Sequence, residues 1–388
     1  MGEGMNCIEI FSGAGGLAKG LELAGSKHKV FVEWNADACN TLRRNYGDSI
    51  VFEGDVREFA FDDYKKYDID IIAGGPPCQP FSLGGKAKGF SDDRDMFPAA
   101  ISAIRTLMPK AFIFENVKGL LRSSFLKYLE YIILQLSYPE AKLPSSDWKE
   151  NLKFLRDVAS GAWYAGVKYN VSYRLLNAAD YGVPQKRERI IIVGFRDDLR
   201  ADWNFPVPTH EEDTLMWEKY VSCDYWEKHG IKNHEDEEMC KVEKKRLVEK
   251  YGMWPPQLKP WRTVRDAFDG LDEPDGTGGE HCLREGARPY PGHTGSDIDK
   301  PAKTIKAGDH GVPGGENMVR FPDGRTRYFS ILEGKRIQTF PDNYIITGAW
   351  TEAMRQLGNA VPVQLAYVIG GSVLQTLAGA AKRTEPLN

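Results

Sequence analysis

The stretch Cys7-Ile8-Glu9-Ile10-Phe11-Ser12-Gly13-Ala14-Gly15-Gly16-Leu17 decides the fold of this chain. Its first five residues form an apolar run of strand length, and a helical pattern follows the glycines. Glycine permits a tight turn and lets the backbone approach a ligand closely at a helix N-terminus. The stretch therefore predicts a strand, a ligand-binding turn and a helix, in that order.

The same alternation of strands and helices continues to residue 195 and predicts an α/β fold with a parallel sheet covered by helices. The expected strands are 6–10, 29–33, 49–53, 69–73, 111–115, 172–177 and 190–195, and the main expected helices are 17–24, 36–45, 97–107 and 123–136. The segment 137–169 is expected to be a surface insertion. The pattern stops near Phe195.

Residues 200–325 are punctuated by proline and glycine in the manner of turns, which predicts a second, smaller, loop-rich domain. Within it, 238–250 is expected to be a solvent-facing helix, and the acidic stretch 211–238 is expected to face water. Ser330 and Glu333 match a capping box that opens a short helix before Pro341. A last apolar helix, 363–377, is expected to return to the first domain. We therefore divide the chain into 1–199, completed by 348–388, and 200–347.

Composition narrows the class of protein. The chain has 388 residues, of which 41% are apolar and 27% charged, as in soluble globular proteins. It shows no signal peptide and no apolar run near the ~20 residues that span a bilayer, so no membrane association is expected. Its six cysteines form no C-x-x-C pair, which predicts neither a metal site nor disulfides and favours a reducing cytoplasm.

Charge gives only a weak indication of the partner. The net charge of −4 argues against nucleic acid. Locally, however, residues 300–336 contain eight Lys and Arg against four acids, so a basic stripe is expected there.

Two acidic residues at later strand ends complement the glycine turn. Glu33 ends the second expected strand and could accept hydrogen bonds from ribose hydroxyls, and Trp34 offers a stacking face. Asp55 follows the third strand and could accept an adenine amino proton. The turn matches neither G-x-G-x-x-G nor a P-loop, so a cofactor with adenosine and no phosphate fits best, and S-adenosylmethionine is the common one.

Cys78 lies in the run Gly74-Gly75-Pro76-Pro77-Cys78-Gln79-Pro80-Phe81-Ser82, directly after an apolar strand. Its prolines exclude helix and sheet ladder, so the thiol is expected in a fixed loop at a sheet edge, where ligands bind. A lone cysteine is more commonly a small buried hydrophobe. The proline setting and the motifs that follow favour a nucleophile.

Three further side chains are candidates for the reacting end. Glu115 ends another apolar strand, where burial beside phenylalanines favours a neutral carboxyl that donates a hydrogen bond. Arg187 and Arg189 alternate onto one face of an extended chain, so both guanidinium groups are expected to point the same way and hold a base edge or phosphate. A capping acid and a solvated basic strand start are the structural alternatives.

Together these blocks resemble the C5-cytosine DNA methyltransferase family of the bacterial restriction-modification type. The resemblance covers about 6–195 and 327–375. Its blocks occur in the family's order, namely Phe11 to Gly16, Pro76-Pro77-Cys78-Gln79, Glu115-Asn116-Val117, Gln185-x-Arg187-x-Arg189, Arg327 through Gln338-Thr339-Phe340-Pro341, and Gln356 to Pro362. Thr304-Ile305 is similar to a pair in the family's recognition domains.

The resemblance implies a Rossmann-like methyltransferase sheet, S-adenosylmethionine as methyl donor and duplex DNA as partner. It implies that Cys78 attacks C6 of a flipped cytosine, with Glu115 at N3 and the amine, Arg189 at O2, and Arg187 and Gln79 in support. The implied cofactor residues are Phe11, Ser12, Gly13, Ala14, Gly15, Gly16, Glu33, Trp34, Asp55, Val56, Pro77, Asn359 and Val361. The candidate DNA-binding residues are Ser82, Lys86, Lys88, Arg94, Arg284, Arg288, Lys303, Thr304 and Lys306.

The remaining expectations concern assembly and the alternatives. We expect a monomer in the bacterial cytoplasm, associated with the nucleoid through DNA, and the resemblance allows a separate cognate restriction endonuclease. A tRNA cytosine methyltransferase is the nearest alternative, but the Cys-Phe-Thr signature of that branch is missing. Intact Cys78, Glu115 and Arg189 argue against a catalytically silent DNA-binding relative, and the glycine pattern argues against an oxidoreductase.

Overall fold

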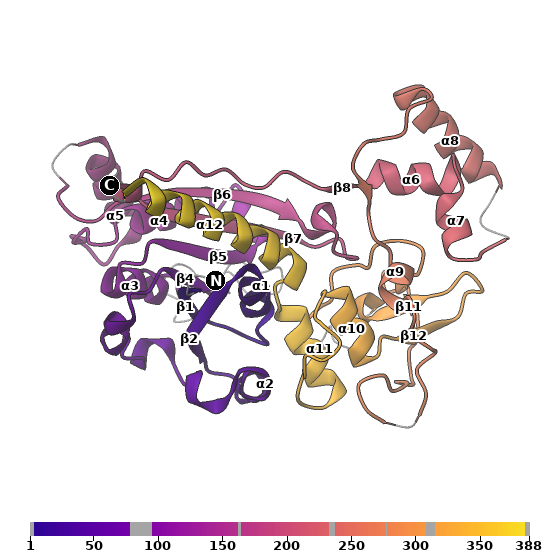
Figure 1. Cartoon of the computed structure of the whole chain (residues 1–388), viewed down its shortest axis with the longest axis horizontal. Coiled ribbons are helices and arrows are strands. Elements are labelled where there is room, and N and C mark those ends of the chain that lie inside the picture. Colours follow the sequence, from indigo (N-terminus) through magenta and orange to yellow (C-terminus); the bar gives the residue numbers. More distant parts are fainter. Residues whose placement is uncertain are drawn as a thin grey trace.

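A computed structural model describes residues 4–77, 95–161, 164–232, 237–276, 278–307 and 315–384. Its larger part is built on a seven-stranded sheet, and a smaller part lies beside it (Figure 1). The strands of the sheet are β1 (Met5–Ile10), β2 (Ser26–Glu33), β3 (Val51–Glu53), β4 (Ile71–Gly74), β5 (Ala111–Val117), β6 (Tyr169–Asn177) and β7 (Glu188–Arg196). All seven expected strands are therefore present.

The sheet is mixed, which corrects the expectation of a parallel sheet. Its order is β3-β2-β1-β4-β5-β7-β6, and β7 runs antiparallel to both of its neighbours. Parallel neighbours need a long crossover, whereas a short connection such as 178–187 between β6 and β7 gives an antiparallel pair. The reversal brings the first residues of β7 to the edge where β1, β4 and β5 end.

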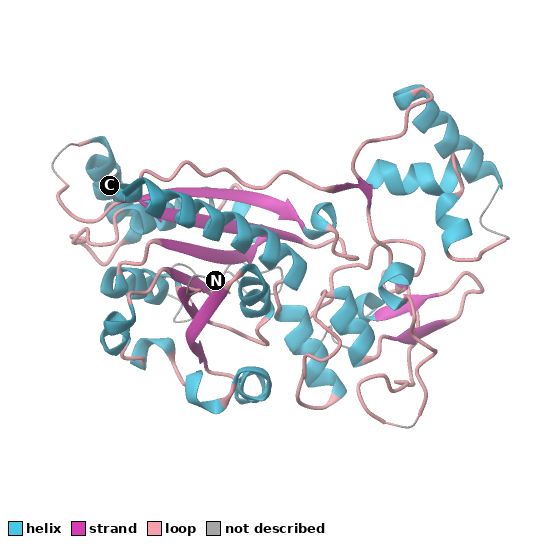
Figure 2. Ribbon diagram, viewed as in Figure 1, coloured by secondary structure: helices cyan, strands magenta, loops and turns pink. Residues whose placement is uncertain are grey.

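Helices cover both faces of this sheet, as Figure 2 shows. They are α1 (Gly16–Ala24), α2 (Ala36–Tyr46), α3 (Phe97–Leu107), α4 (Leu126–Ser137), α5 (Trp148–Ser160) and α12 (Val363–Thr384). One core joins Ile8, Ile72 and Phe112 to α3, α4 and α5. A second core joins Cys7, Ile71 and Ile113 to α1 and α12 on the opposite face. The alternation of side chains along each strand accounts for the two cores.

The segment 137–169 is more than the surface insertion that was expected. Its helix α5 buries Leu152 and Leu155 in the core beside α4. Apolar residues at positions 152, 155 and 158 recur at helical spacing and explain which face turns inward.

The smaller part contains short strands and helices linked by loops (Figure 1). They are β8 (His210–Glu211), α6 (Glu212–Tyr220), α7 (Asp224–Lys228), α8 (Glu237–Tyr251), β9 (Lys259–Pro260), α9 (Val264–Phe268), β10 (Ser296–Asp297), β11 (Met318–Arg320), β12 (Thr326–Tyr328), α10 (Ile331–Ile337) and α11 (Trp350–Asn359). The predicted capping box is present at α10, where Ser330 and Glu333 satisfy each other's backbone donors. Helix α11 shares its core with α9 and α10 rather than with the large sheet.

The acidic stretch 211–238 is only partly solvent-facing, which corrects the prediction. Leu215, Tyr225 and Trp226 are buried in a cluster of their own. Asp213 accepts hydrogen bonds from Lys250, Arg246 and Tyr251 at 2.6, 3.1 and 2.8 Å, and these donors join α6 to α8. Although burial opposes the change, they lower the pKa of Asp213 to about 2.

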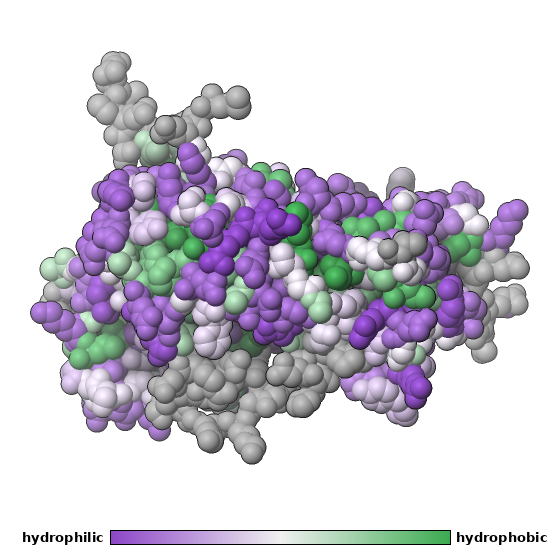
Figure 3. Space-filling view, turned by 90° about the horizontal axis from the view of Figure 1, so that it is seen from below, coloured by the Kyte–Doolittle hydropathy of each residue, from purple (hydrophilic) through white to green (hydrophobic). Residues whose placement is uncertain are grey.

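Among the residues that the structure describes, the helical stretch Trp350–Ala381 is long and apolar enough to cross a membrane by length and composition. Most of it is buried inside the protein, because α12 packs along α1. At their crossing, a Cβ atom on Gly20 would lie 2.4 Å from the Cβ of Ala366, so the absence of a side chain permits the close approach. The face shown in Figure 3 is mostly hydrophilic where it is coloured, with several hydrophobic areas between the hydrophilic ones.

Candidate active site

The candidate residues of the large part gather at one edge of the sheet. Strands β1, β2, β3, β4 and β5 are parallel, so their carboxyl ends meet at this edge. The pairing of Val117 with Arg189 places the start of β7 at the same edge. Carboxyl ends of strands are where open α/β sheets bind ligands.

The glycine turn between β1 and α1 is hydrogen-bonded to the side chain of Glu33. The Glu33 carboxylate accepts the backbone N–H of Gly13 at 2.7 Å on one oxygen and those of Trp34 and Asn35, both at 2.9 Å, on the other. Burial raises the pKa of Glu33, and the three donors oppose the rise. Gly13 and Gly15 adopt φ angles of 52° and 78°, which favour glycine.

The neighbouring cofactor candidates differ in exposure. Trp34 is 79% exposed beside the buried Glu33, so a face of its indole is available for stacking. Asp55 begins the turn after β3 and accepts the Arg57 backbone N–H at 2.9 Å, and it is also paired with the Arg57 guanidinium. Hydrogen bonds from Arg57 lower the pKa of Asp55. Val56 is buried directly behind it.

The Pro-Pro-Cys run is held at its base. Asn116 donates from its side-chain amide to the Pro76 carbonyl at 3.0 Å, and the Met96 N–H donates to the Pro77 carbonyl at 3.1 Å. These bonds bring together the two ends of the segment that carries the proposed nucleophile. Cys78, Gln79, Ser82, Lys86, Lys88 and Arg94 lie outside the described residues.

Glu115 and Arg189 form an ion pair at the sheet edge, with 2.5 Å between Oε1 and Nε. Both side chains are more than four-fifths buried, and a Cβ on Gly75 would lie 3.2 Å from the other carboxylate oxygen. The carboxyl group of Glu115 therefore has the guanidinium of Arg189 as its partner. A paired carboxylate and guanidinium offer an acceptor and donors to a polar ligand that enters between them.

Arg187 lies close enough to Arg189 and Glu115 for their charges to interact, but its hydrogen bonds go to backbone carbonyls. It is fully buried and donates to the carbonyls of Ile305, Gly358 and Ala360 at 3.3, 2.7 and 3.0 Å. Burial, together with the neighbouring Arg189, lowers the pKa of Arg187. Its bonds join the start of β7 to two distant segments.

The C-terminal candidates lie against the glycine turn. Val361 is buried in the connection between α11 and α12, and Asn359, the last residue of α11, is exposed. A Cβ on Gly16 would lie only 2.2 Å from the Val361 carbonyl oxygen. Tyr344 also contacts this turn, since its hydroxyl donates to the Ala14 carbonyl at 2.7 Å, and no local pattern predicts this contact because the two residues are 330 positions apart.

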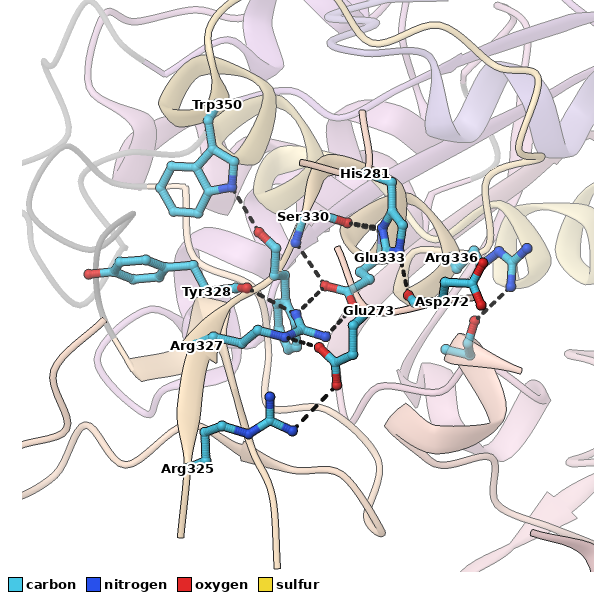
Figure 4. A network of polar contacts seen from close by, with 12 residues as sticks. Asp272, Glu273, His281, Arg325, Arg327, Tyr328, Ser330, Glu333, Arg336 and Trp350 are labelled. Carbon is cyan, nitrogen blue, oxygen red and sulfur yellow. Dashed lines mark hydrogen bonds and ion pairs between the residues drawn. The ribbon is translucent and has the colours of Figure 1, made fainter. Parts of the chain in front are cut away.

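The predicted basic stripe is largely neutralised within the smaller part. Figure 4 shows Arg327 donating to the buried Glu333 and also to Glu273, while His281 contacts Ser330. Lys335 is fully buried and pairs with Glu280. Arg327 and Lys335 therefore stabilise the fold, whereas Lys300, Lys306, Arg320 and Arg325 keep about half of their side chains exposed.

The candidate DNA-reading residues are spread over this part. Thr304 donates to the Lys186 carbonyl at 2.8 Å, Lys306 pairs with Glu316 at 2.7 Å, and Lys303 donates to Thr294 at 3.3 Å. The guanidinium of Arg284 lies 5.6 Å above the ring of Trp350. Arg288 is exposed.

The edge has the features that an adenosine-containing cofactor needs. A Cβ on Gly13 would meet no atom within 4 Å, so the turn borders open space. The buried carboxylate of Glu33 and the exposed indole of Trp34 lie next to this turn. The carboxylate of Glu33, the indole of Trp34 and the backbone of the glycine turn therefore fit a nucleoside.

Comparison with known families agrees with this geometry. The family model described as C-5 cytosine-specific DNA methylase matches residues 5–138 and 156–375. The chain belongs to this family. It is a DNA (cytosine-5-)-methyltransferase.

Two curated relatives support the assignment of this methyltransferase. It is 32% identical to the type II methyltransferase M.Eco47II of Escherichia coli, over 97% of the chain and 80% of that protein. It is 34% identical to the type II methyltransferase M.Sau96I of Staphylococcus aureus, over 96% of the chain and 76% of that protein.

Solved structures show the same fold at lower identity. A putative DNA modification methyltransferase encoded within an E. coli prophage has a TM-score of 0.60 and 19% identity, covering 96% of this chain and 99% of that one. The S. pombe Dnmt2 methyltransferase has a TM-score of 0.58 and 16% identity, covering 97% and 99%. These likenesses support the Rossmann-like methyltransferase fold of the enzyme.

Proposed function

We propose that the enzyme methylates C5 of a flipped cytosine in a specific duplex DNA sequence, with S-adenosylmethionine as methyl donor and Cys78 as nucleophile. The observation that carries this proposal is the Glu115–Arg189 ion pair, which lies beside Gly75 at the base of the Pro-Pro-Cys run. Attack of a thiolate on C6 of cytosine requires an acid and a hydrogen-bond donor to the edge of the base, both close to the thiol.

On this proposal the cofactor is held at the ends of β1, β2 and β3. Glu33 accepts from the ribose hydroxyls, Trp34 stacks on the adenine, and Asp55 accepts from its amino group. The methyl donor supplies the electrophilic methyl group when bound. The remaining residues proposed to line the site are Phe11, Ser12, Gly13, Ala14, Gly15, Gly16, Val56, Pro77, Asn359 and Val361.

The cytosine is proposed to enter between Glu115 and Arg189. The Cys78 thiolate adds to C6, and Glu115 offsets the negative charge that develops at N3 by donating a proton there, which leaves C5 as a nucleophilic enamine carbon. The N3 proton returns to Glu115 when the thiolate is eliminated. Arg189 contacts O2. After methyl transfer, loss of the C5 proton to a base such as water eliminates the thiolate and restores the aromatic ring. Arg187 is proposed to hold the backbone around Arg189 in place through its buried hydrogen bonds, and Gln79 is next to the nucleophile in the sequence.

Duplex DNA is proposed to lie between the two parts of the chain. Unstacking the target base is required because C6 is inaccessible inside the duplex. Ser82, Lys86, Lys88 and Arg94 are proposed to contact the DNA from the loop after the nucleophile. Arg284, Arg288, Lys303, Thr304 and Lys306 are proposed to face it from the smaller part.

The division into a catalytic domain, 1–199 with 348–388, and a recognition domain, 200–347, belongs to the same proposal, although α11 packs with α9 and α10 of the smaller part. We also propose that the enzyme is a monomer that works on the nucleoid in the bacterial cytoplasm. The type II names of its relatives favour a restriction-modification system with a separate endonuclease.

Two measurements test this function. Labelled S-adenosylmethionine is incubated with the protein and either mixed-sequence duplex DNA or tRNA. Transfer to DNA alone is expected, Cys78→Ser should abolish it, and Cys240→Ser, a change at a half-buried thiol on α8, should not. Transfer only to tRNA, or full activity in Cys78→Ser, contradicts the proposal. Bisulfite sequencing of DNA from a methylation-free host that expresses the chain then identifies the target site.

A further inference from the structure

Three fully buried polar side chains form a hub between the two parts of the chain. They are Gln185 and Arg187, which precede β7, and Gln338, which follows α10. Gln185 donates to the side-chain oxygen of Gln338 at 3.1 Å. We refer to these three residues as the interdomain hub. The sequence motifs contained Gln338 but gave it no role.

On one side, the hub binds the strap, residues 302–306. The Ile305 N–H donates to Gln185 at 3.2 Å, and the Ile305 carbonyl accepts from Arg187 at 3.3 Å. The strap also pairs with the backbone around Gln185, since Ala302 exchanges hydrogen bonds of 2.9 Å with Pro184 and Lys186. Lys303, Thr304 and Lys306, the residues of the strap proposed to contact DNA, are thus attached to a buried network in which the Arg187 Nε has no hydrogen-bond partner among the described residues.

On the other side, the hub binds the cofactor turn, residues 357–361. The Gln338 amide donates to the Leu357 carbonyl and, at 3.3 Å, to the Ala360 carbonyl, which also accepts from Arg187 at 3.0 Å. The turn and the strap nearly touch, because a Cβ on Gly358 would lie 2.7 Å from the Lys306 carbonyl carbon. The strap and the turn that carries Asn359 and Val361 therefore lie next to each other and share Arg187 as a hydrogen-bond donor.

The backbone next to Gln338 is held in a costly conformation. Thr339 has a φ angle of 59°, which is rare for a β-branched residue. Its hydroxyl donates to the Gln338 carbonyl at 2.6 Å and accepts the Gln364 N–H at 2.8 Å. Such strain persists only where the surroundings fix it, and it concentrates at functional positions.

We propose that Gln338 is a positioning residue that sets the cofactor turn according to the position of the strap. The inference rests on the proposed function, in that DNA contacts the strap and S-adenosylmethionine the turn. Each buried amide and carbonyl in the hub has a partner, so a shift on one side that broke these bonds would leave polar groups unpaired. DNA and cofactor therefore strengthen each other's binding, and the coupling is reciprocal.

The experiment measures the Kd of S-adenosylhomocysteine, the demethylated cofactor, by calorimetry with and without a duplex that contains the target site. For the wild type we expect the duplex to lower this Kd by at least about fivefold. Gln338→Met keeps the length of the side chain but removes the amide oxygen and nitrogen. For this variant we expect the ratio of the Kd without duplex to the Kd with duplex to fall to within about twofold of unity.

Gln135→Met is the matched control, because Gln135 is also buried but lies in α4, outside the hub. It should lower thermal stability as Gln338→Met does and keep the wild-type ratio. Gln185→Met is the second variant, since it removes the link to Gln338 and leaves the bonds between Gln338 and the turn in place. Its effect on the ratio should not add to that of Gln338→Met in the double variant.

The outcomes separate the inference from the proposed function. If the active wild-type enzyme has a Kd ratio of unity, or if both hub variants keep the wild-type Kd ratio, the role of Gln338 is refuted and the proposed function is not affected. Failure of the wild type to methylate DNA refutes the proposed function instead. If Gln338→Met does not fold, Gln185→Met is measured in its place, and a Kd ratio equal to that of the wild type refutes the role of Gln338.

Discussion

The buried ion pair between Arg327 and Glu333 gives the sharpest stability prediction. Two hydrogen bonds of 2.8 and 2.7 Å join the side chains, which are 9% and 1% exposed (Figure 4). Glu333 also accepts the Ser330 N–H at 2.8 Å and so caps α10. The substitution Arg327→Met removes the cation and leaves the Glu333 carboxylate buried without its main partner.

Removal of one partner from such a pair costs about 3–5 kcal/mol of the free energy of unfolding. For a unit of about 150 residues, each kcal/mol lowers Tm by roughly 2–4 °C, so we expect a decrease of roughly 6–20 °C in the transition of the smaller part. Differential scanning calorimetry measures this transition, and the affinity for the target duplex should fall with it because α10 and the strap share one core.

Arg325→Met is the matched control. Its guanidinium is 55% exposed and lies 3.4 Å from Glu273, and exposed pairs of this kind contribute about 0–1 kcal/mol. The reasoning is refuted if Arg327→Met lowers Tm by no more than Arg325→Met does.

Three further predictions concern the cofactor edge and α6. Glu33→Gln replaces a carboxylate that accepts three backbone donors, so the Kd for S-adenosylhomocysteine should rise by at least about tenfold, the equivalent of about 1.4 kcal/mol; an unchanged calorimetric Kd contradicts the role of Glu33. Asp213 has a pKa of about 2 against an ordinary value of 3.8, so its stabilisation is present above pH 3.8 and lost as pH falls toward 2. Asp213→Asn should therefore lower the urea midpoint at pH 7 and match the wild type near pH 2, whereas a difference independent of pH excludes the ion-pair explanation. Gly16→Ala places a Cβ 2.2 Å from the Val361 carbonyl oxygen and should abolish methyl transfer, whereas Gly371→Ala in α12 meets no atom within 4 Å and should leave transfer intact; equal activity of these two variants would contradict the packing argument.

Local patterns predicted the elements well, and the reasons are visible in particular residues. The helix expected at 97–107 coincides with α3, where a proline follows the first residue and apolar side chains recur at helical spacing. The capping box at Ser330 was readable because its two side chains are three residues apart. These features depend on neighbours in the sequence.

Long-range contacts were not readable in the same way. The orientation of β7 depends on which strand it pairs with, and period-two alternation is the same in either direction. The partners of Arg187 lie 118, 171 and 173 positions away, so its role as a buried link could not be inferred from its alternation with Arg189. The helices α6 and α7 were not predicted, because the acidic composition of this stretch indicated a solvent-exposed segment, whereas Tyr225 and Trp226 form a small buried aromatic core.

The packing of α12 against α1 has a consequence for the synthesis of the protein. One face of the sheet, with Cys7, Ile71 and Ile113, is covered jointly by the first helix and the last. While the chain grows on the ribosome, the part of that face under α12 stays open to water until residues 363–384 have emerged. Exposed apolar strands are sites of aggregation and of chaperone binding. The catalytic sheet is therefore encoded first and completed last, and the smaller part has the opportunity to fold in the interval.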